Sequence, residues 1–393
     1  MSQDIFMTQN IGDFRTPSCE LLALGEPTHQ EPAFGLVRNR LFAQLVAQGF
    51  RSIALETDRV AALAVDDHVR HGVGTLDAVL AEGFTHGFGA QQANRELVAW
   101  MREFNRDREA AEQVACHGFD LPTENTTAPS PRRYLEHARD YLQLDLDVAA
   151  LTGEDERWER EEAILDAAAS PGATPEAERL RRTADDLLNQ LYVRAPDLIA
   201  ATSHAEWLRV GVHLRAGLGV LRYHAQAAVQ GLGTSARISG LIRMRDALMA
   251  QNLLDIRAVE ARRGPTLVFA HNRHLQRNPS AWSQDELDCG WNGAGHIVGS
   301  LLEERYVFVP GSLGRSATLG LGEPAPGTYE ARLQTGAGAW RLTAPPVSGT
   351  ARTRTDTTPR QGYFPLDPET LDGAAALLHI VDGGAVGDGG AVG

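Results

Sequence analysis

The sequence contains no lysine, and all 37 of its basic residues are arginine. A chain without lysine cannot form a Schiff base with a carbonyl substrate, cannot supply the lysine of a phosphate-binding P-loop and cannot build a Ser-Lys dyad. These three classes of chemistry are therefore excluded. The arginine bias itself is what a GC-rich coding sequence produces, so we attach no function to it.

Cysteine is also scarce. The three thiols, Cys19, Cys116 and Cys289, are odd in number and lie far apart, which is typical of neither a disulfide framework nor a zinc site. We therefore expect a reducing compartment. The first residues lack a basic region followed by an apolar run, which favours a cytoplasmic protein, and no stretch approaches membrane-spanning length. We expect no membrane partner.

Basic residues are fewer than acidic residues, 37 against 51, so the formal net charge is -14. A negative field repels the phosphate backbone, so we expect no nucleic-acid partner. The hydrophobic fraction of 43% is large enough for an ordinary globular core. These properties favour an enzyme that acts on a small-molecule substrate as a monomer or homodimer.

The sequence also lacks the Gly-x-Ser-x-Gly pattern of serine hydrolases; Ser312 follows Gly311 but has no glycine two positions before it. Cys116, beside His117, is a conceivable thiol nucleophile, although a buried strand cysteine is the commoner case. We therefore favour water as the nucleophile in any hydrolytic reaction.

Short apolar runs alternate with helical patterns in the first part of the chain, and strand character returns late. The fold class that this order predicts is α/β, with a central mixed, mostly parallel sheet flanked by helices and with a large helical insertion. The predicted strands are Leu21–Leu24, Ser52–Leu55, Val114–Phe119, Thr266–Ala270, Ile297–Leu301 and Tyr306–Val309.

The boundaries follow from composition. Between about residues 131 and 255 the strand signals disappear and long helical patterns replace them, which indicates an insertion or subdomain. The Gly-rich end, with its repeated Gly-Ala-Val-Gly, is typical of a disordered tail. We expect four parts: 1–130 as the first part of the α/β core, 131–255 as the helical insertion, 256–382 as the remainder of the core and 383–393 as the tail.

Two turns carry the residues suited to acid/base chemistry. The segment LALGEPTHQE places Glu26 and His29 just beyond a predicted strand, where a carboxylate can orient an imidazole that removes a proton from water. A solvent-facing turn capped by Thr28 is the plainer interpretation of this motif alone. The segment FAHNRHLQR delivers His271 and His274 to a second strand end, and two such sites in one chain are less easily accidental.

Metal binding is an alternative use of the second turn, because histidines three apart lie on one face of a helical turn. A first shell would then need a carboxylate such as Glu26 or Glu56. Without an HExxH motif or cysteine ligands, we favour acid/base work and expect neither a metal nor a cofactor.

These segments together resemble the erythromycin esterase family, whose pattern pairs a Gly-Glu-x-x-His turn with a later His-Asn-x-His turn. The resemblance spans roughly residues 20 to 310 and extends to further residues in the same order: Arg38, Glu56, the segment Gly118–Asp120 and the helix Arg245–Asn252.

The resemblance implies hydrolysis of a macrolide lactone without a covalent intermediate. His29 would be the general base, Glu26, His271 and His274 would surround the scissile carbonyl, and Arg38 and Glu56 would be supporting charges. We expect Asp120 and Arg245 to bind the substrate.

Other functions remain open from the sequence. The same groups could catalyse cyclisation or elimination on a biosynthetic intermediate, since nothing in the motifs requires water. A protein that only binds a small molecule or a metal is a third interpretation. For any of the enzymatic functions, the imidazole of His29 must lie within on the order of 10 Å of His271 or His274.

Overall fold

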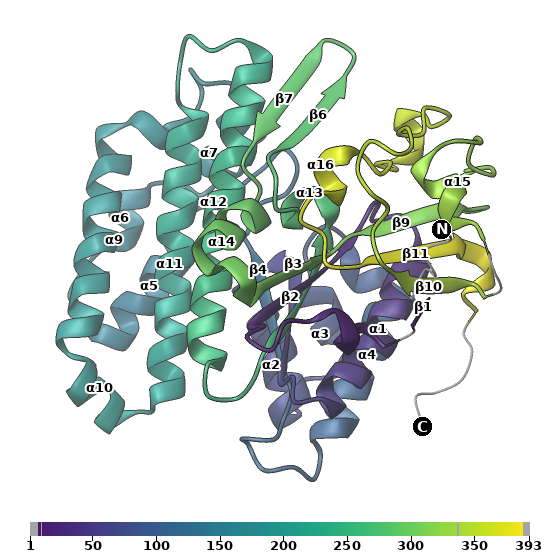
Figure 1. The fold of residues 1–393 in the computed structure, drawn as a ribbon. Helices are drawn as coiled ribbons and strands as arrows, with labels where there is room; N and C mark the ends of the chain where they lie inside the picture. Colours follow the sequence, from purple (N-terminus) through teal and green to yellow (C-terminus); the bar gives the residue numbers. More distant parts are fainter. Residues whose placement is uncertain (1–6, 9, 336–337, 388–393) are drawn as a thin grey trace.

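A five-stranded parallel sheet forms the centre of the protein in a computed structural model that describes residues 7–8, 10–335 and 338–387 (Figure 1). The strand order is β4-β3-β5-β2-β8, so segments far apart in sequence are neighbours in the sheet. The strands are β2 (Leu21–Glu26), β3 (Ser52–Asp58), β4 (Ala115–Asp120), β5 (Thr266–His271) and β8 (Tyr306–Val309). This arrangement confirms the α/β class.

Both faces of this sheet are buried, which explains why its strands are continuous apolar runs rather than alternating patterns. In β2, Leu22 and Leu24 join one hydrophobic cluster, whereas Leu21 and Ala23 join a second cluster on the other face. The helices that cover the first face are α1 (Pro32–Ala47), α2 (Ala62–His71), α3 (Leu76–Glu82) and α4 (Gln92–Asn105), with the short 3-10 helix η2 (Phe88–Ala90) before α4.

The long helices lie between β4 and β5 in the chain and stand together beside the sheet (Figure 1). They have a separate hydrophobic cluster of their own, and α12 connects them to the second face of the sheet. The elements are α5 (Arg132–Leu142), α6 (Val148–Thr152), α7 (Glu156–Glu159), α8 (Glu162–Leu165), η3 (Pro171–Ala173), α9 (Pro175–Val193), α10 (Ala195–Ala201), α11 (His204–Ala227) and α12 (Thr234–Glu260). None of the helices in the described part of the chain has both the length and the apolarity that crossing a membrane requires.

A second, mixed sheet of four strands lies on the opposite side of the central sheet from the long helices (Figure 1). Its strands are β1 (Met7–Thr8), β10 (Trp340–Thr343), β11 (Leu377–Asp382) and β9 (Gly311–Arg315), and a separate hairpin joins β6 (Ser280–Gln284) to β7 (Leu287–Trp291). The remaining elements are η1 (Ile11–Phe14), α13 (Asn272–Leu275), α14 (Ala294–Leu302), η4 (Glu303–Arg305), α15 (Tyr329–Leu333), η5 (Pro359–Gln361), α16 (Pro368–Leu371) and η6 (Gly383–Ala385).

The strand predicted at Ile297–Leu301 is wrong, because these residues belong to helix α14. The buried positions of α14 include Ala294, Val298 and Leu302, which are four apart and therefore share one helical face. The β-branched pair Ile297 and Val298 suggested a strand, but helical spacing on the buried face decided the outcome. Of the predicted tail, residues 388–393 lie outside the described residues.

Candidate active site

Four polar side chains stand at or near the carboxyl ends of neighbouring parallel strands. Glu26 ends β2, Glu56 lies near the end of β3, Asp120 ends β4 and His271 ends β5. Parallel strands bring their carboxyl ends to the same edge of a sheet, and Glu26 is the direct partner of His271 in the β2–β5 register. The sheet itself therefore gathers residues that are up to 245 positions apart.

The two motif turns are also joined by close packing. A Cβ atom on Gly25 would lie 2.1 Å from Oδ1 of Asn272, so only glycine permits this approach. The side chain of Asn272 binds the first residue of strand β9, Gly311. Its Nδ2 donates to the Gly311 carbonyl at 2.8 Å, and its Oδ1 accepts from the Gly311 amide at 3.0 Å. The glycine of the first motif and the asparagine of the second thus fix the distance between the turns.

The turn after β2 places Glu26 and His29 in direct contact. His29 Nδ1 lies 2.8 Å from Glu26 Oε1. Burial raises the pKa of Glu26. Partial burial opposes charge on His29, but the carboxylates of Glu56 and Glu26 outweigh it and raise the pKa of His29 to about 9. Without substrate, the imidazole of His29 is therefore the more protonated partner at neutral pH.

Glu56 is the centre of the cluster. Its Oε1 lies 3.7 Å from His29 Nε2, 3.4 Å from His274 Nε2 and 3.3 Å from Arg245 Nη2, and its Oε2 accepts from the His271 backbone amide at 2.9 Å. Burial alone would raise the pKa of Glu56, but the charges of His29, His274 and Arg245 lower it to about 2. Glu56 is therefore ionised at neutral pH.

His274 lies between two carboxylates, which favour its protonated form. Its Nδ1 lies 2.9 and 3.0 Å from the two carboxylate oxygens of Asp246, which also accepts the Ala294 amide at 2.8 Å. Burial opposes charge on the ring, but Asp246 and Glu56 raise the pKa of His274 above its ordinary value. The ring can therefore donate a proton on each nitrogen.

His271 has the opposite electrostatic state. Burial and the neighbouring His29 and His274 hold the pKa of His271 well below its ordinary value, so the ring is neutral. Its Nδ1 accepts from the Arg273 amide at 3.2 Å, which places the single ring proton on Nε2. That Nε2 is buried and has no hydrogen-bond partner among the described residues. The site thus holds one unused N–H donor.

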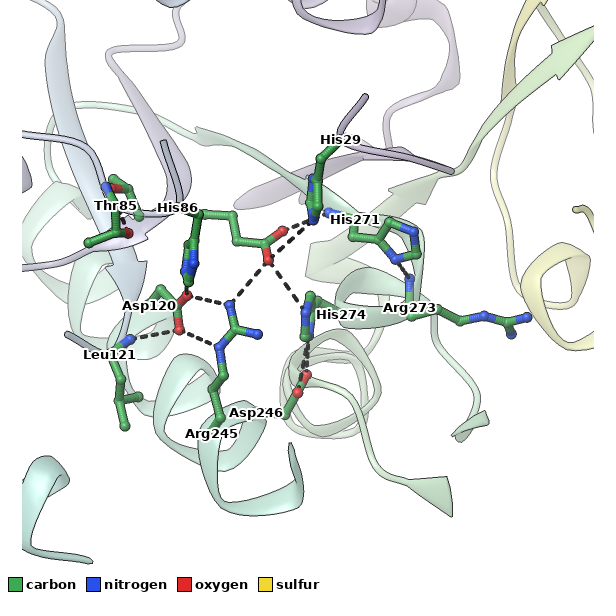
Figure 2. Close-up of polar contacts among 12 residues, drawn as sticks. His29, Thr85, His86, Asp120, Leu121, Arg245, Asp246, His271, Arg273 and His274 are labelled. Atoms are coloured by element: carbon green, nitrogen blue, oxygen red, sulfur yellow. Dashed lines mark hydrogen bonds and ion pairs between the residues drawn. The ribbon is translucent and has the colours of Figure 1, made fainter. Parts of the chain in front are cut away.

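Figure 2 shows the rings of His29 and His274 directed at one carboxylate, that of Glu56, with the ring of His271 beside them and in contact with the Arg273 amide. The ring centroids of His29 and His271 are 5.3 Å apart, and those of His271 and His274 are 6.5 Å apart. Two half-buried phenylalanines form apolar walls: Phe88 lies 5.1 Å from the His29 ring and Phe364 lies 4.7 Å from the His271 ring. The polar cluster therefore sits beside surfaces suited to an apolar substrate.

Asp120 and Arg245 form a salt bridge at one side of the cluster (Figure 2). Arg245 Nε donates to Asp120 Oδ1 at 2.9 Å, and His86 Nε2 lies 3.2 Å from Asp120 Oδ2. Asp120 has no exposed surface, and the charge of Arg245 lowers its pKa despite burial. Arg245 thereby joins two strand-end carboxylates, Asp120 and Glu56, from helix α12.

Arg38 lies behind Glu26 rather than inside the cluster. Its guanidinium donates to Asn94 Oδ1 at 2.9 Å and to Asn39 Oδ1 at 2.7 Å, and it lies over the Phe269 ring at 4.9 Å. Burial lowers the pKa of Arg38 to about 10, although the charge of Glu26 opposes this shift. Arg38 and Glu26 line one small cavity, so Arg38 acts on the cluster through the field at Glu26.

Two other nucleophiles are not accessible. Cys116 is 2% exposed, and burial raises the pKa of its thiol, so it is a core residue. Ser312 Oγ contacts His379 Nδ1 at 2.8 Å, but both residues have no exposed surface and belong to the second sheet. Neither residue can meet a substrate.

Four residues of this region were missed by the sequence interpretation: Asp246, His86, Phe88 and Phe364. Asp246 had a detectable signal, because it directly follows Arg245 in the motif helix. His86 adopts a left-handed backbone conformation with φ of 56°, which sequence patterns do not reveal in a histidine. The two phenylalanines lie in irregular or single-turn segments that carry no periodic signal.

Comparison with known proteins assigns the family. The sequence profile of the erythromycin esterase family matches residues 46–380, a range that includes Glu56, Asp120, Arg245 and His271–His274 and begins after His29. No curated protein sequence matches the chain.

Three solved structures share the fold. They are a protein from Bacillus cereus (17% identity, TM-score 0.64, covering 93% of this chain and 89% of that chain), a succinoglycan biosynthesis protein (16%, 0.63, 93% and 88%) and a mutant of the erythromycin esterase EreC in its open conformation (17%, 0.63, 93% and 91%). At these identities the likeness concerns the fold. Because the profile covers most of the chain, this protein belongs to the erythromycin esterase family and is an esterase-type hydrolase.

Proposed function

We propose that this enzyme hydrolyses an ester or lactone of a hydrophobic, macrolide-like natural product by direct attack of water. The observation that carries the proposal is the convergence of the Glu26–His29 pair and the His271–His274 turn around the single carboxylate of Glu56. The apolar walls at Phe88 and Phe364 support an apolar substrate.

His29 is the proposed general base. Its Nδ1 is occupied by Glu26, which fixes the tautomer and leaves Nε2 to accept a proton from water. The water oxygen then forms a bond to the carbonyl carbon while the proton moves to His29. Glu26 stays in place as the orienting carboxylate.

His271 is the proposed donor to the carbonyl oxygen. As water attacks, negative charge develops on that oxygen, and a preorganised N–H in an enclosed site stabilises this charge. His271 Nε2 carries a proton that no described residue accepts, and the ring is neutral, so it can donate without first losing another partner.

His274 is the proposed proton source for the leaving alcohol. When the tetrahedral intermediate collapses, the carbon–oxygen bond of the ester breaks and the leaving alkoxide takes a proton, which gives an alcohol and a carboxylic acid. His274 is cationic between Asp246 and Glu56, and it lies 6.5 Å from the His271 ring. His29 then releases the proton of the attacking water to solvent and His274 takes up a proton from solvent, which restores the starting state of both residues.

Product mass tests the reaction type. The enzyme is incubated with a panel of macrolide lactones and with p-nitrophenyl butyrate as a generic ester. Hydrolysis adds the mass of one water to a lactone and opens its ring. A product of unchanged mass, or one that has lost water, would contradict hydrolysis and would point to cyclisation or elimination.

The rate should rise with pH. A general base must be neutral to accept a proton, and the pKa of His29 is raised to about 9 by Glu56 and Glu26 against the opposing effect of burial. We expect kcat/KM to increase about tenfold per pH unit below this value, and to fall again at the higher pH where His274, the proposed proton donor, loses its proton. Profiles from pH 6 to 10 check this, and a flat profile between pH 7 and 9 would remove His29 as the base.

Activity should survive exhaustive chelation. A divalent ion held by His29, His274 and Glu56 would need the Glu56 oxygen that already faces the cation Arg245 at 3.3 Å, so like charges would oppose its binding. In the described residues no group of three or more histidines, cysteines or carboxylates has the arrangement of a metal site. Loss of turnover with chelator and recovery with one added metal would contradict this expectation.

A further inference from the structure

A second cavity lies between α11, α12 and the segment that follows β4. Asp120 is the one residue that its lining shares with the cluster at the sheet edge. The cavity is not lined by any of the five glutamates and histidines of the catalytic cluster, Glu26, His29, Glu56, His271 and His274. The cavity is therefore a separate place on the molecule, next to the reacting groups.

The cavity carries an excess of positive charge. Arg59, Arg215 and Arg222 are among its lining residues. Arg59 Nη1 lies 3.2 Å from Asp255 Oδ2, and Arg215 Nε lies 3.1 Å from the same oxygen. One carboxylate thus serves two guanidinium groups and can neutralise only one of them. In a chain with a net charge of -14, such a local excess runs against the overall composition.

Asp120, the carboxylate in the lining, does not remove this excess. Both of its oxygens are engaged by Arg245, and they also contact His86 and the Leu121 amide. Its negative charge is therefore neutralised from the side of the catalytic cluster. The arginines of the cavity are left with Asp255 alone.

Two of these arginines have capacity for another anion. The Arg59 side chain is only 9% exposed and shares its carboxylate partner, Asp255, with Arg215; burial together with the charge of Arg215 lowers the pKa of Arg59. Arg222 is exposed and makes no hydrogen bond or ion pair with the residues that the structure describes. An anion placed between the guanidinium groups would stabilise both.

The rest of the lining is largely apolar and includes Leu121, Val212, Leu218 and Leu248. Such walls do not suit a compact, strongly hydrated phosphate, whereas they gain from contact with hydrocarbon. We propose that this cavity binds the carboxylate of a small organic acid, with its charge on the arginines and its apolar body against the leucines and valine.

Octanoate is the probe, and octanamide is its neutral counterpart of similar shape. We expect calorimetric titration of the full chain to show octanoate binding, with octanamide and inorganic phosphate at least about tenfold weaker, because charge-assisted hydrogen bonds contribute about this much or more. Equal binding of octanamide or phosphate, or no binding of octanoate, would overturn the proposal.

Variants locate the site. The double variant Arg215→Gln with Arg222→Gln should weaken octanoate binding at least about tenfold, while its circular dichroism and melting temperature report that it is folded. Arg182→Gln, on an exposed position of α9, is the matched control and should bind as the parent does.

A carboxylate could also enter the catalytic cleft as a mimic of the acid product. His29→Asn separates the two sites, since it should leave octanoate binding unchanged if the arginine cavity holds the ligand. Loss of binding in His29→Asn together with normal binding in the arginine double variant would overturn the proposal. Neither result depends on whether the enzyme hydrolyses esters.

Discussion

Replacing His29 by asparagine is expected to lower kcat/KM by about two to four powers of ten, the usual cost of losing a general base. Asparagine keeps a donor that can reach Glu26 but has no nitrogen able to take a proton from water. The fold should be retained, because the His29 side chain is 34% exposed and lies in a turn rather than in the core.

The measurement is the steady-state rate on macrolide lactones and on p-nitrophenyl butyrate, with the free energy of unfolding measured on the same samples. His71→Asn is the matched control, since His71 is an exposed histidine at the end of α2. Turnover of His29→Asn equal to that of the parent would remove His29 from the mechanism and leave Glu26, whose pKa burial raises, as the next base to test.

The strands of the central sheet were predictable because burial on both faces leaves a recognisable apolar run. The predicted strand Tyr306–Val309 matches β8, and Leu21–Leu24 is the apolar part of β2. The apolar run ends at Leu24, two residues before Glu26, although strand β2 continues to Glu26. Apolar patterns therefore miss functional polar residues at the end of a buried strand.

Partners of the site residues were harder to predict than the residues themselves. Glu26 and His29 lie three apart, so their contact follows from local chain geometry. Asp246 contacts His274 across 28 positions, and Glu56 contacts the His271 amide across 215 positions. Such contacts depend on strand order and on the placement of α12, and neither is encoded in a local pattern.

The charge state of each histidine also depends on the assembled structure. His271 and His274 come from one short segment, yet the pKa of His271 is lowered and the pKa of His274 is raised. The difference arises because the carboxylate of Asp246 reaches only the His274 ring, while burial and the neighbouring His29 and His274 disfavour charge on the His271 ring. A role as neutral donor or as cation therefore could not be assigned from the spacing alone.

Because Glu56 contacts several charged groups at the centre of the cluster, we expect its replacement to destabilise the protein strongly. Glu56→Gln is expected to lower the free energy of unfolding by about 3–5 kcal/mol, since removing one partner of a buried charge network leaves the others uncompensated. Glutamine preserves the shape and can still accept the His271 amide, but it leaves His29, His274 and Arg245 facing a neutral group. Glu82→Gln, at an exposed position, is the matched control.

The pH dependence of this loss has a definite sign. The pKa of Glu56 is lowered from its ordinary 4.5 to about 2 by His29, His274 and Arg245, against burial. Its ionised form therefore stabilises the fold fully above pH 4.5 and progressively less as the pH falls toward 2. The difference in unfolding free energy between the parent and Glu56→Gln should shrink over that range, and a difference that stays constant would contradict a charge effect.

Glu56→Gln should also shift the pH dependence of kcat/KM, and a loss of stability alone would not produce such a shift. Glu56 is the strongest of the charges that raise the pKa of His29, so Glu56→Gln should move the rising limb of kcat/KM from about pH 9 toward the ordinary histidine value of 6.5. A general loss of structure would lower the rate at every pH without moving the limb. A limb that stays near pH 9 in the folded variant would show that Glu56 does not control the charge of His29.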